Sequence, residues 1–295
     1  MKLKEPFLAC NDEWDYNNPP FKFPVYVSSK MDGIRCWDPE GDGYQSRWRK
    51  DLGNDYIIDT LNDLAPPWCD GEIVIPGKTF HETQSIVSTR RGKPEFRFYI
   101  FDHLQKPAMR YINRLKFLLK LHPGYVYNLK NGSIAEVLHG SEVNNTKELL
   151  KAFRHSQRAE EEGLIIRDDS PYKSGRSTLT GSPMMLKMVE WRTDECTIIG
   201  FNEKMAQKNP TAPCEAGKIP LDTLGSFQVL WKQHTFNLAG KLSEEEEYIW
   251  DHQAEYRGKP ITFKYKTYGM KDKPRQPIFL GIREELPTST EQDSL

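Results

Sequence analysis

The sequence contains no long apolar run. No segment of its 295 residues has enough consecutive apolar residues to span a bilayer, and residues 1–24 have neither a long apolar core nor a small-residue cleavage site. Cysteines are few and scattered, with none in a Cys-x-x-Cys pair: Cys10, Cys36, Cys69, Cys196 and Cys214. A disulfide framework and a zinc ribbon are therefore not expected. These absences predict a cytoplasmic globular protein, and its length favours two domains.

An excess of charge of one sign is also lacking, because the formal net charge is -1. A local basic concentration lies in residues 257–275, which hold seven basic side chains and one acid. Within it, residues 261–266 alternate in polarity, so Lys264 and Lys266 share one face of a strand. This face is a candidate phosphate-contacting surface, and an ordinary solvated strand face is the alternative.

The hydrophobic pattern predicts a mixed α and β structure without internal repeats. Short strands are expected at residues 25–28, 34–37, 71–75, 96–101 and 164–167. Helices are expected at residues 110–121 and 146–161. Strands interspersed with helices indicate an α+β catalytic domain over residues 1–189.

A second domain is expected over residues 190–295, where the pattern changes to short strands, one helix and a long polar loop. Residues 243–246 form a capping box at the start of the helix, and Gly258 follows its end. The loop, residues 202–222, has no periodicity, and such long loops are usually functional or disordered. The pattern suits a small β-barrel of the OB-fold type, which commonly binds nucleic acid.

The most informative motif is KMDGIR at residues 30–35. It places the Lys30 amine ahead of a carboxylate at Asp32, a glycine at Gly33 and a guanidinium at Arg35. This set suits attack by the amine on a phosphate whose charge the arginine holds. Four specified positions are modest evidence by themselves, so the remaining sequence must supply the context.

Four further motifs follow in order. They are DGE at residues 70–72, FD at 101–102, EGLIIR at 162–167 and LKM at 186–188. With them the chain resembles the ATP-dependent DNA ligases, most closely the minimal two-domain enzymes of algal viruses and bacteriophages. The resemblance extends over nearly the whole sequence and includes residues 80–85, 172–178, 273–279 and 281–283. It implies a nucleotidyltransferase (adenylation) domain of antiparallel sheets with helices, followed by a C-terminal OB-fold β-barrel.

The activity implied by the resemblance is nick sealing in duplex DNA by three transfers. Lys30 attacks the α-phosphate of ATP and releases pyrophosphate, AMP passes to the 5'-phosphate of a nick, and the 3'-hydroxyl then displaces AMP. A lysine must be neutral to attack, and positive charge from Arg35, Lys187 and bound Mg²⁺ (or Mn²⁺) favours that form. DNA repair, replication and recombination are the processes implied.

The resemblance also implies where the metal and the base are held. Glu162, and less directly Glu72, are the expected Mg²⁺ ligands, with Glu72 also contacting the ribose. Phe101 is expected to stack on adenine. From the residues alone, an acid at a strand end is usually just solvated, and an aromatic residue in a strand usually belongs to the core.

Arginines supply the remaining implied contacts, because fork-shaped donors suit phosphate oxygens. Arg47 and Arg176 are expected beside the nucleotide and the nick phosphate, while Asp32 would orient Lys30 or Arg35. The expected catalytic residues are Lys30, Asp32, Arg35 and Lys187. The expected nucleotide contacts are Lys30, Arg35, Arg47, Glu72, Phe101, Glu162, Arg176 and Lys187.

The sequence departs from the family pattern after Lys187. The family commonly has two lysines one residue apart, and Val189 stands at the second position here. Either one cationic contact to the α-phosphate is lost or a neighbour such as Arg192 supplies it. The departure predicts slower lysine adenylylation than in a two-lysine site.

Nicked double-stranded DNA is the expected partner, bound by a monomer without an obligate protein partner. The loop at residues 202–222 is expected to act as a latch around the duplex, and the basic contacts are expected to be independent of base sequence. The expected DNA contacts are Arg47, Lys173, Arg176, Lys204, Lys208, Lys218, Lys264, Lys266, Arg275 and Arg283.

Three other functions remain open from the sequence. An mRNA-capping guanylyltransferase shares the lysine motif and an OB domain, and an RNA ligase is a second enzyme alternative. A non-enzymatic OB-type nucleic-acid-binding module is the alternative from a different class. An NAD-dependent ligase is disfavoured, because only about thirty residues precede Lys30 and no four-cysteine zinc site follows.

Overall fold

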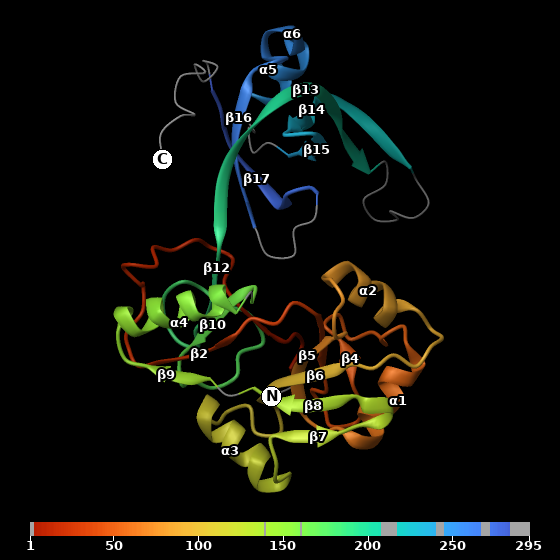
Figure 1. Ribbon diagram of the computed structural model, residues 1–295, viewed down its shortest axis with the longest axis vertical. Coiled ribbons are helices and arrows are strands. Elements are labelled where there is room, and N and C mark those ends of the chain that lie inside the picture. Colours follow the sequence, from red (N-terminus) through yellow and green to blue (C-terminus); the bar gives the residue numbers. More distant parts are fainter. Residues whose placement is uncertain are drawn as a thin grey trace. The chain divides into compact units, whose positions relative to one another are not determined.

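The computed structural model describes residues 3–138, 140–159, 161–207, 217–239, 245–266 and 272–283. The chain divides into two compact units, Met1–Val189 and Glu190–Leu295 (Figure 1). Helices and strands are mixed in the first unit, whereas the second is built mainly on one sheet. The expected α+β fold class is confirmed.

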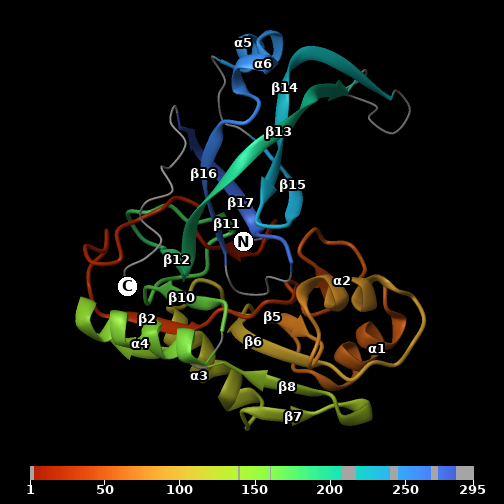
Figure 2. The same ribbon diagram turned by 45° about the horizontal axis from the view of Figure 1, so that its top comes forward.

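A four-stranded antiparallel sheet in the first unit carries the lysine of the KMDGIR motif at the end of one strand. Its strands, in spatial order, are β12 (Met185–Val189), β10 (Gly163–Arg167), β2 (Val25–Ser29) and β9 (Ser141–Val143). Helix α4 (Thr146–Arg158) lies alongside β2 and β10 (Figure 2). Leu149 and Phe153 fall four residues apart on one face of α4 and are buried in the core of this sheet.

A six-stranded sheet forms the other half of the first unit. Its spatial order is β4 (Gln45–Ser46), β3 (Ile34–Trp37), β5 (Cys69–Val74), β6 (Arg97–His103), β8 (Ile134–Val137) and β7 (Val126–Asn128). Only β6 and β8 pair in parallel within it. Its core contains Ile57 of helix α1 (Asp55–Leu64) and Leu118 of helix α3 (Tyr111–Leu121). Helix α2 (Phe80–Ser88) begins at a capping box in which Thr79 and Glu82 satisfy each other's backbone N–H groups.

Short elements complete the first unit. Strand β1 (Phe7–Leu8) pairs in parallel with β11 (Gly175–Arg176), which brings the N-terminal segment beside the segment between the two motif strands β10 and β12. A 3-10 turn, Lys130–Gly132, joins β7 to β8.

The second unit contains a five-stranded antiparallel sheet. Its spatial order is β15 (His234–Leu238), β14 (Lys218–Trp231), β13 (Trp191–Gln207), β16 (Pro260–Lys266) and β17 (Arg275–Ile282). Alternating residues of β16, namely Ile261, Phe263 and Tyr265, are buried in its core as the alternation predicts. Within the described residues no strand pairing joins β15 to β17, so the expected barrel is present as an open sheet.

Two expectations for the second unit need correction. The loop predicted at residues 202–222 begins and ends as strand, because Met205 pairs with Pro220 and Gln207 with Lys218. The single helix predicted before Gly258 consists of two short helices, α5 (Glu246–Asp251) and α6 (Gln253–Tyr256), with His252 in a non-helical conformation between them. The predicted capping box at residues 243–246 lies partly outside the described residues, and Glu245, the observed cap position, makes no side-chain capping bond.

Long-range strand pairing explains the first correction. The polar end of β13 has no hydrophobic period of its own, but its backbone is satisfied by β14, and sequence periodicity does not report such pairing. None of the helices in the described residues has the length and apolar character needed to cross a membrane.

Candidate active site

Lys30 follows the last residue of β2 and lies beside Glu162, which precedes β10. The Lys30 backbone N–H donates to the Gly163 carbonyl over 2.9 Å, and the Lys30 Nζ forms an ion pair with Glu162. The Lys30 side chain is 23% exposed and that of Glu162 only 2% exposed. A β-carbon at Gly163 would lie 2.1 Å from the Met188 carbonyl oxygen, so glycine permits this close approach. The amine is thus accessible while its carboxylate partner is fixed.

Arg35 extends from the six-stranded sheet and is held rigidly. Its Nε and Nη2 atoms donate to the two oxygens of the buried Asp70 carboxylate, each over 2.6 Å. Its guanidinium carbon lies 4.4 Å from the centre of the Phe101 ring. Burial opposes the charge of Arg35, but Asp70 outweighs it, so the pKa of Arg35 is raised above its ordinary value.

Phe101 sits at an irregularity in the sheet. Asp70 pairs with Asp102 and Gly71 with Ile100, so Phe101 is the extra residue of a β-bulge between β5 and β6. Bulges re-aim side chains, and the Phe101 ring is half-buried rather than part of the core. Periodicity alone predicts that Phe101 is buried in the core, and this prediction is wrong.

Glu72 lies opposite Arg35 in the pairing of β5 with β3. Its carboxylate accepts a hydrogen bond from the backbone N–H of Gly33, whose own β-carbon would lie 2.1 Å from the Ile73 carbonyl oxygen. Burial raises the pKa of Glu72 to about 7 and the Glu162 charge adds to the rise, while Arg35 and Lys30 oppose it. A cation between Glu72 and Glu162 would relieve their repulsion.

This pair fits Mg²⁺ in its donor chemistry. The ion commonly binds through one or two carboxylates and completes its shell with water and substrate phosphate. Across the described residues no cluster of three or more His, Cys, Asp or Glu side chains forms a metal site. The two carboxylates therefore suit an ion that arrives with a phosphate ligand better than one held by the protein alone.

A group of cationic side chains, formed by Arg47, Arg176 and Lys187, lies near Arg35. The Arg176 Nη1 donates to Asn11 Oδ1 over 2.9 Å, and the Lys187 Nζ donates to the same oxygen over 3.1 Å. Burial lowers the pKa of Arg47, and the nearby charges of Arg176 and Arg35 lower it further. Mutual repulsion among guanidinium groups is relieved by an anion such as phosphate.

The structure adds two polar residues to those selected from the sequence. Asp70 was visible as the first residue of the DGE motif, but its role as the bidentate partner of Arg35 depends on the pairing of β3 with β5. Asn11, which joins Arg176 to Lys187, stands in the N-terminal segment without any sequence signal. Asp32 lies half-buried two residues after Lys30, and Glu162 and Asp70 form ion pairs with Lys30 and Arg35.

Val189 shares a face of β12 with Lys187, since the two residues are two apart on a strand. Its side chain is only 2% exposed. The Tyr16 hydroxyl accepts from the Val189 N–H and donates to the Val189 carbonyl, each over 3.1 Å. The Tyr16 hydroxyl therefore holds both backbone polar groups of Val189.

Replacing Val189 by lysine should accelerate lysine adenylylation, because a second ammonium would join Lys187 near the transferred phosphate. We expect roughly a tenfold gain in single-turnover rate, typical of one added charge-assisted contact. Val189→Met, which is similarly long but uncharged, is the matched control. An unchanged or lower rate for Val189→Lys would mean that the missing lysine is not the limitation.

The remaining predicted DNA contacts occupy several environments. In the first unit, Lys173 precedes Ser174, whose Oγ accepts the backbone N–H groups of Lys4 and Glu5 over 3.1 and 3.0 Å. In the second unit, Lys204 pairs with Glu246 and Arg283 pairs with Glu195 at 2.8 Å.

On the same sheet, Lys218 is exposed at the start of β14, and Arg275 is half-buried at the start of β17. The ammonium groups of Lys264 and Lys266 lie 5.4 and 5.7 Å from the centre of the Trp191 ring, and Lys266 is only 5% exposed. Lys208 lies outside the described residues.

Comparison with known proteins agrees with this arrangement. Residues 219–283 match the model of the DNA ligase OB-like domain family. The chain is 31% identical to a Chlorella virus DNA ligase-adenylate over 96% of its own length and 99% of that chain, with a TM-score of 0.56. A second crystal structure of the Chlorella virus ligase-adenylate gives 30% identity over 95% and 100% of the two chains, with a TM-score of 0.55.

A more distant structure supports the fold. A structure from a study of Lig E DNA ligases has a TM-score of 0.67 at 21% identity, covering 94% of this chain and 98% of that one. No curated protein sequence matched the chain. The fold thus defines a nucleotidyltransferase domain followed by an OB-type domain. At 31% identity over nearly the whole of both chains, the protein belongs to the ATP-dependent DNA ligase family.

Proposed function

We propose that the protein seals nicks in duplex DNA with ATP, and that Lys30 carries AMP as a covalent intermediate. The observation that carries this proposal is the contact between the accessible Lys30 amine and the buried Glu162 carboxylate, beside a group of arginines suited to phosphate. Membership of the ligase family supports the substrate class.

In the first step Lys30 attacks the α-phosphate, so that a nitrogen–phosphorus bond forms as the bond to pyrophosphate breaks. Glu162 holds the Lys30 amine in place. The Phe101 face receives adenine, and Glu72 contacts the ribose. Glu72 and Glu162 are the residues that would hold Mg²⁺, which neutralises charge on the phosphates.

Positive side chains act on the transferred phosphate. Asp70 binds the Nε and Nη2 atoms along one edge of the Arg35 guanidinium, so the group is preorganised rather than free to rotate. Arg47, Arg176 and Lys187 supply further charge, and Asn11 holds the last two together. Such preorganised charge stabilises the transition state of each of the three transfers.

The setting we propose is a monomer acting on nicked duplex in the cytoplasm. All four cysteines in the described residues are buried and unpaired, which suits a reducing compartment. Contacts to phosphates through lysine and arginine predict binding that weakens with salt and is insensitive to base sequence.

Incubation with α-labelled ATP and Mg²⁺, followed by nicked DNA, tests the proposal. We expect a covalent label on the protein that nicked DNA discharges, together with sealed product. Labelling by GTP in place of ATP would instead support a capping guanylyltransferase, and discharge only by nicked RNA would support an RNA ligase. Nucleic-acid binding without any label would reduce the protein to a binding module.

The end of the β13–β14 hairpin is the segment we propose as a latch around DNA. Ala206 pairs with Ile219 there, whereas the buried core of the sheet begins further along β14 at Leu224. Met205, Ile219 and Leu221 are each more than 40% exposed, so this end of the hairpin is not needed for the core.

Deleting residues 206–220 and joining the strands with two glycines should therefore reduce nick sealing by about tenfold or more, as expected when a binding contact is removed. Lysine adenylylation should stay within twofold of the parent, because Lys30 lies in the other compact unit. The two rates are measured separately by single-turnover labelling and by sealing of a nicked duplex. Equal loss of both would refute the latch.

A further inference from the structure

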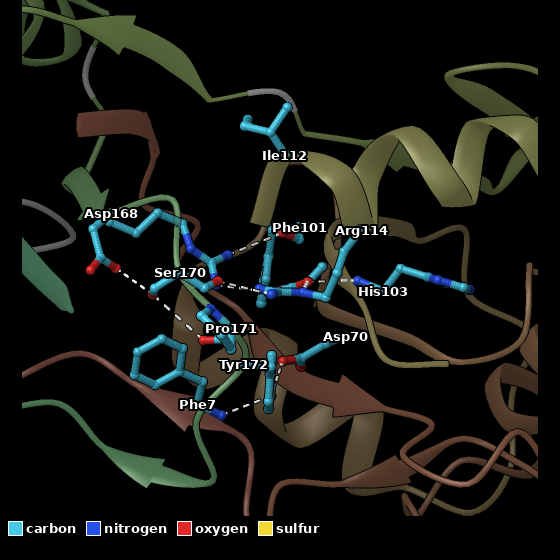
Figure 3. Close-up of polar contacts among 12 residues, drawn as sticks. Phe7, Asp70, Phe101, His103, Ile112, Arg114, Asp168, Ser170, Pro171 and Tyr172 are labelled. Carbon is cyan, nitrogen blue, oxygen red and sulfur yellow. Dashed lines mark hydrogen bonds and ion pairs between the residues drawn. The ribbon is translucent and has the colours of Figure 1, made fainter. Parts of the chain in front are cut away.

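A buried cluster of charge joins the two sheets of the first unit. Asp102, at the end of β6, is 0% exposed and accepts from two arginines, Arg114 of α3 and Arg167 of β10. The Arg114 Nε and Nη2 atoms bind its two oxygens over 2.7 and 2.9 Å, and the Arg167 Nη2 binds one of them over 2.7 Å. Figure 3 shows Arg114 beside Phe101 and His103 within this cluster.

The cluster differs from a simple ion pair. Two guanidinium groups share one carboxylate in the interior, and the Arg167 Nε has no hydrogen-bond partner among the described residues. The Tyr111 ring lies 3.9 Å from the Arg167 guanidinium carbon and offsets part of the lost hydration. Buried charge of this kind often adds little to stability compared with apolar packing, which suggests a geometric role.

The cluster reaches the nucleotide site through Phe101. The Arg167 Nη1 donates to the Phe101 carbonyl over 3.3 Å, and Asp102 is the next residue along the chain. Phe101 occupies the β-bulge, where one strand pairing is missing. The hydrogen bond from Arg167 therefore holds the Phe101 backbone at a point where the pairing of β5 with β6 does not fix it.

The other end of the same connection carries the reacting lysine. Arg167 is the last residue of β10, and Glu162, the partner of Lys30, immediately precedes that strand. Strand β10 thus fixes Lys30 at one end and Phe101 at the other, although the two residues belong to different sheets.

Arg114 extends this connection to Arg35. Its Nη1 donates to the Ser170 carbonyl over 2.9 Å, which fixes the segment that carries Tyr172. The Tyr172 hydroxyl donates to Asp70 over 2.6 Å (Figure 3). Asp70 in turn holds Arg35. The base-stacking residue and the phosphate-holding arginine are therefore tied to one buried cluster.

We propose that Asp102, Arg114 and Arg167 are positioning residues that set the distance between the Phe101 ring and the Lys30 amine. None of the three belongs to the nucleotide or metal contacts proposed above. They act on ATP affinity, because the ring must face adenine while the α-phosphate lies at Lys30. The inference rests on the proposed function in assuming that ATP is the substrate of Lys30.

Arg167→Met is the informative substitution. It removes the contact to Phe101 but leaves both oxygens of Asp102 paired with Arg114. Because it also removes one buried positive charge, we expect the fold to be retained. We expect the KM for ATP in lysine adenylylation to rise about fivefold or more, as expected for weakened stacking of one base, with kcat changed less than twofold. Arg167→Lys, which keeps the charge but not the fork, should give an intermediate KM.

A double substitution separates positioning from general loosening of the fold. Phe101→Leu alone should raise the KM for ATP, and adding Arg167→Met to it should raise the KM little further, because both act through one ring. Leu118→Ala, a cavity in the buried face of α3, is the control and should lower Tm without changing this KM.

Three results would overturn the inference. They are an unchanged KM in Arg167→Met, full additivity with Phe101→Leu, and an equal rise in KM in the Leu118→Ala control. Absence of any label in the parent protein would instead overturn the proposed function, so the two failures are distinguishable.

Discussion

Replacement of Lys30 by alanine should reduce lysine adenylylation by more than about a thousandfold, the scale of loss seen when a nucleophile is removed. Lys30 supplies the nitrogen that bonds to the α-phosphate, and its amine is held by the buried Glu162 carboxylate. The change is measured as covalent label from α-labelled ATP in a single turnover. Lys130→Ala, which removes an exposed lysine paired with Asp63, is the control and should keep the parent rate.

Two further measurements separate chemistry from structure. Lys30→Arg keeps a positive charge for Glu162, but a guanidinium stays protonated and cannot attack, so it should be as inactive as alanine. A nick that already carries AMP on its 5'-phosphate needs no enzyme–AMP adduct, so Lys30→Ala should still seal it. Label retained in either variant would show that another residue carries the AMP.

Replacement of Asp102 by asparagine should lower the free energy of unfolding by about 3–5 kcal/mol, the effect of removing one partner from a buried ion pair. The substitution keeps the shape of the side chain but leaves the buried guanidinium groups of Arg114 and Arg167 without their counter-charge. The loss is measured from denaturation of the parent and variant at pH 7. Lys130→Ala should leave the denaturation curve nearly unchanged, because its ion pair is exposed.

The same carboxylate predicts a dependence on acid. Burial favours its neutral form, but Arg114 and Arg167 outweigh burial and lower the pKa of Asp102 to about 2. Because that pKa is below the ordinary value of 3.8, its contribution is fully present above about pH 4 and is lost as pH falls towards 2. The shift corresponds to about 2 kcal/mol, so the difference in stability between parent and Asp102→Asn should narrow by about that amount over this range. A constant difference down to pH 2 would contradict the assignment.

Local patterns in the sequence were sufficient for the elements that carry the lysine motif. The short apolar segments at residues 25–28 and 34–37 predicted β2 and β3, and the structure confirms both, with β2 one residue longer. The helical spacing of residues 110–121 predicted α3, which begins one residue later. These elements bury a face whose period is visible in the sequence itself.

The partners of the site residues were less accessible to prediction. Asp70 meets Arg35 only because β5 pairs with β3, and Asn11 meets Arg176 and Lys187 only because β1 pairs with β11. Register across strands depends on packing between distant segments, which one sequence does not display. The same reason applies to the hairpin of β13 and β14, whose polar ends pair without a hydrophobic period.

The sequence by itself determined the family and the chemical types at the site, since a lysine, two carboxylates and several arginines recur in a fixed order along the chain. Tertiary structure alone decided how readily each carboxyl group ionises. Burial and neighbouring charges together raise the pKa of Glu72 and lower the pKa of Asp102. Tertiary structure also placed Phe101 on a bulge and joined it through Arg167 to the strand beside Lys30. Residue identity is local, whereas electrostatic environment and distance are set by segments that meet only in the folded chain.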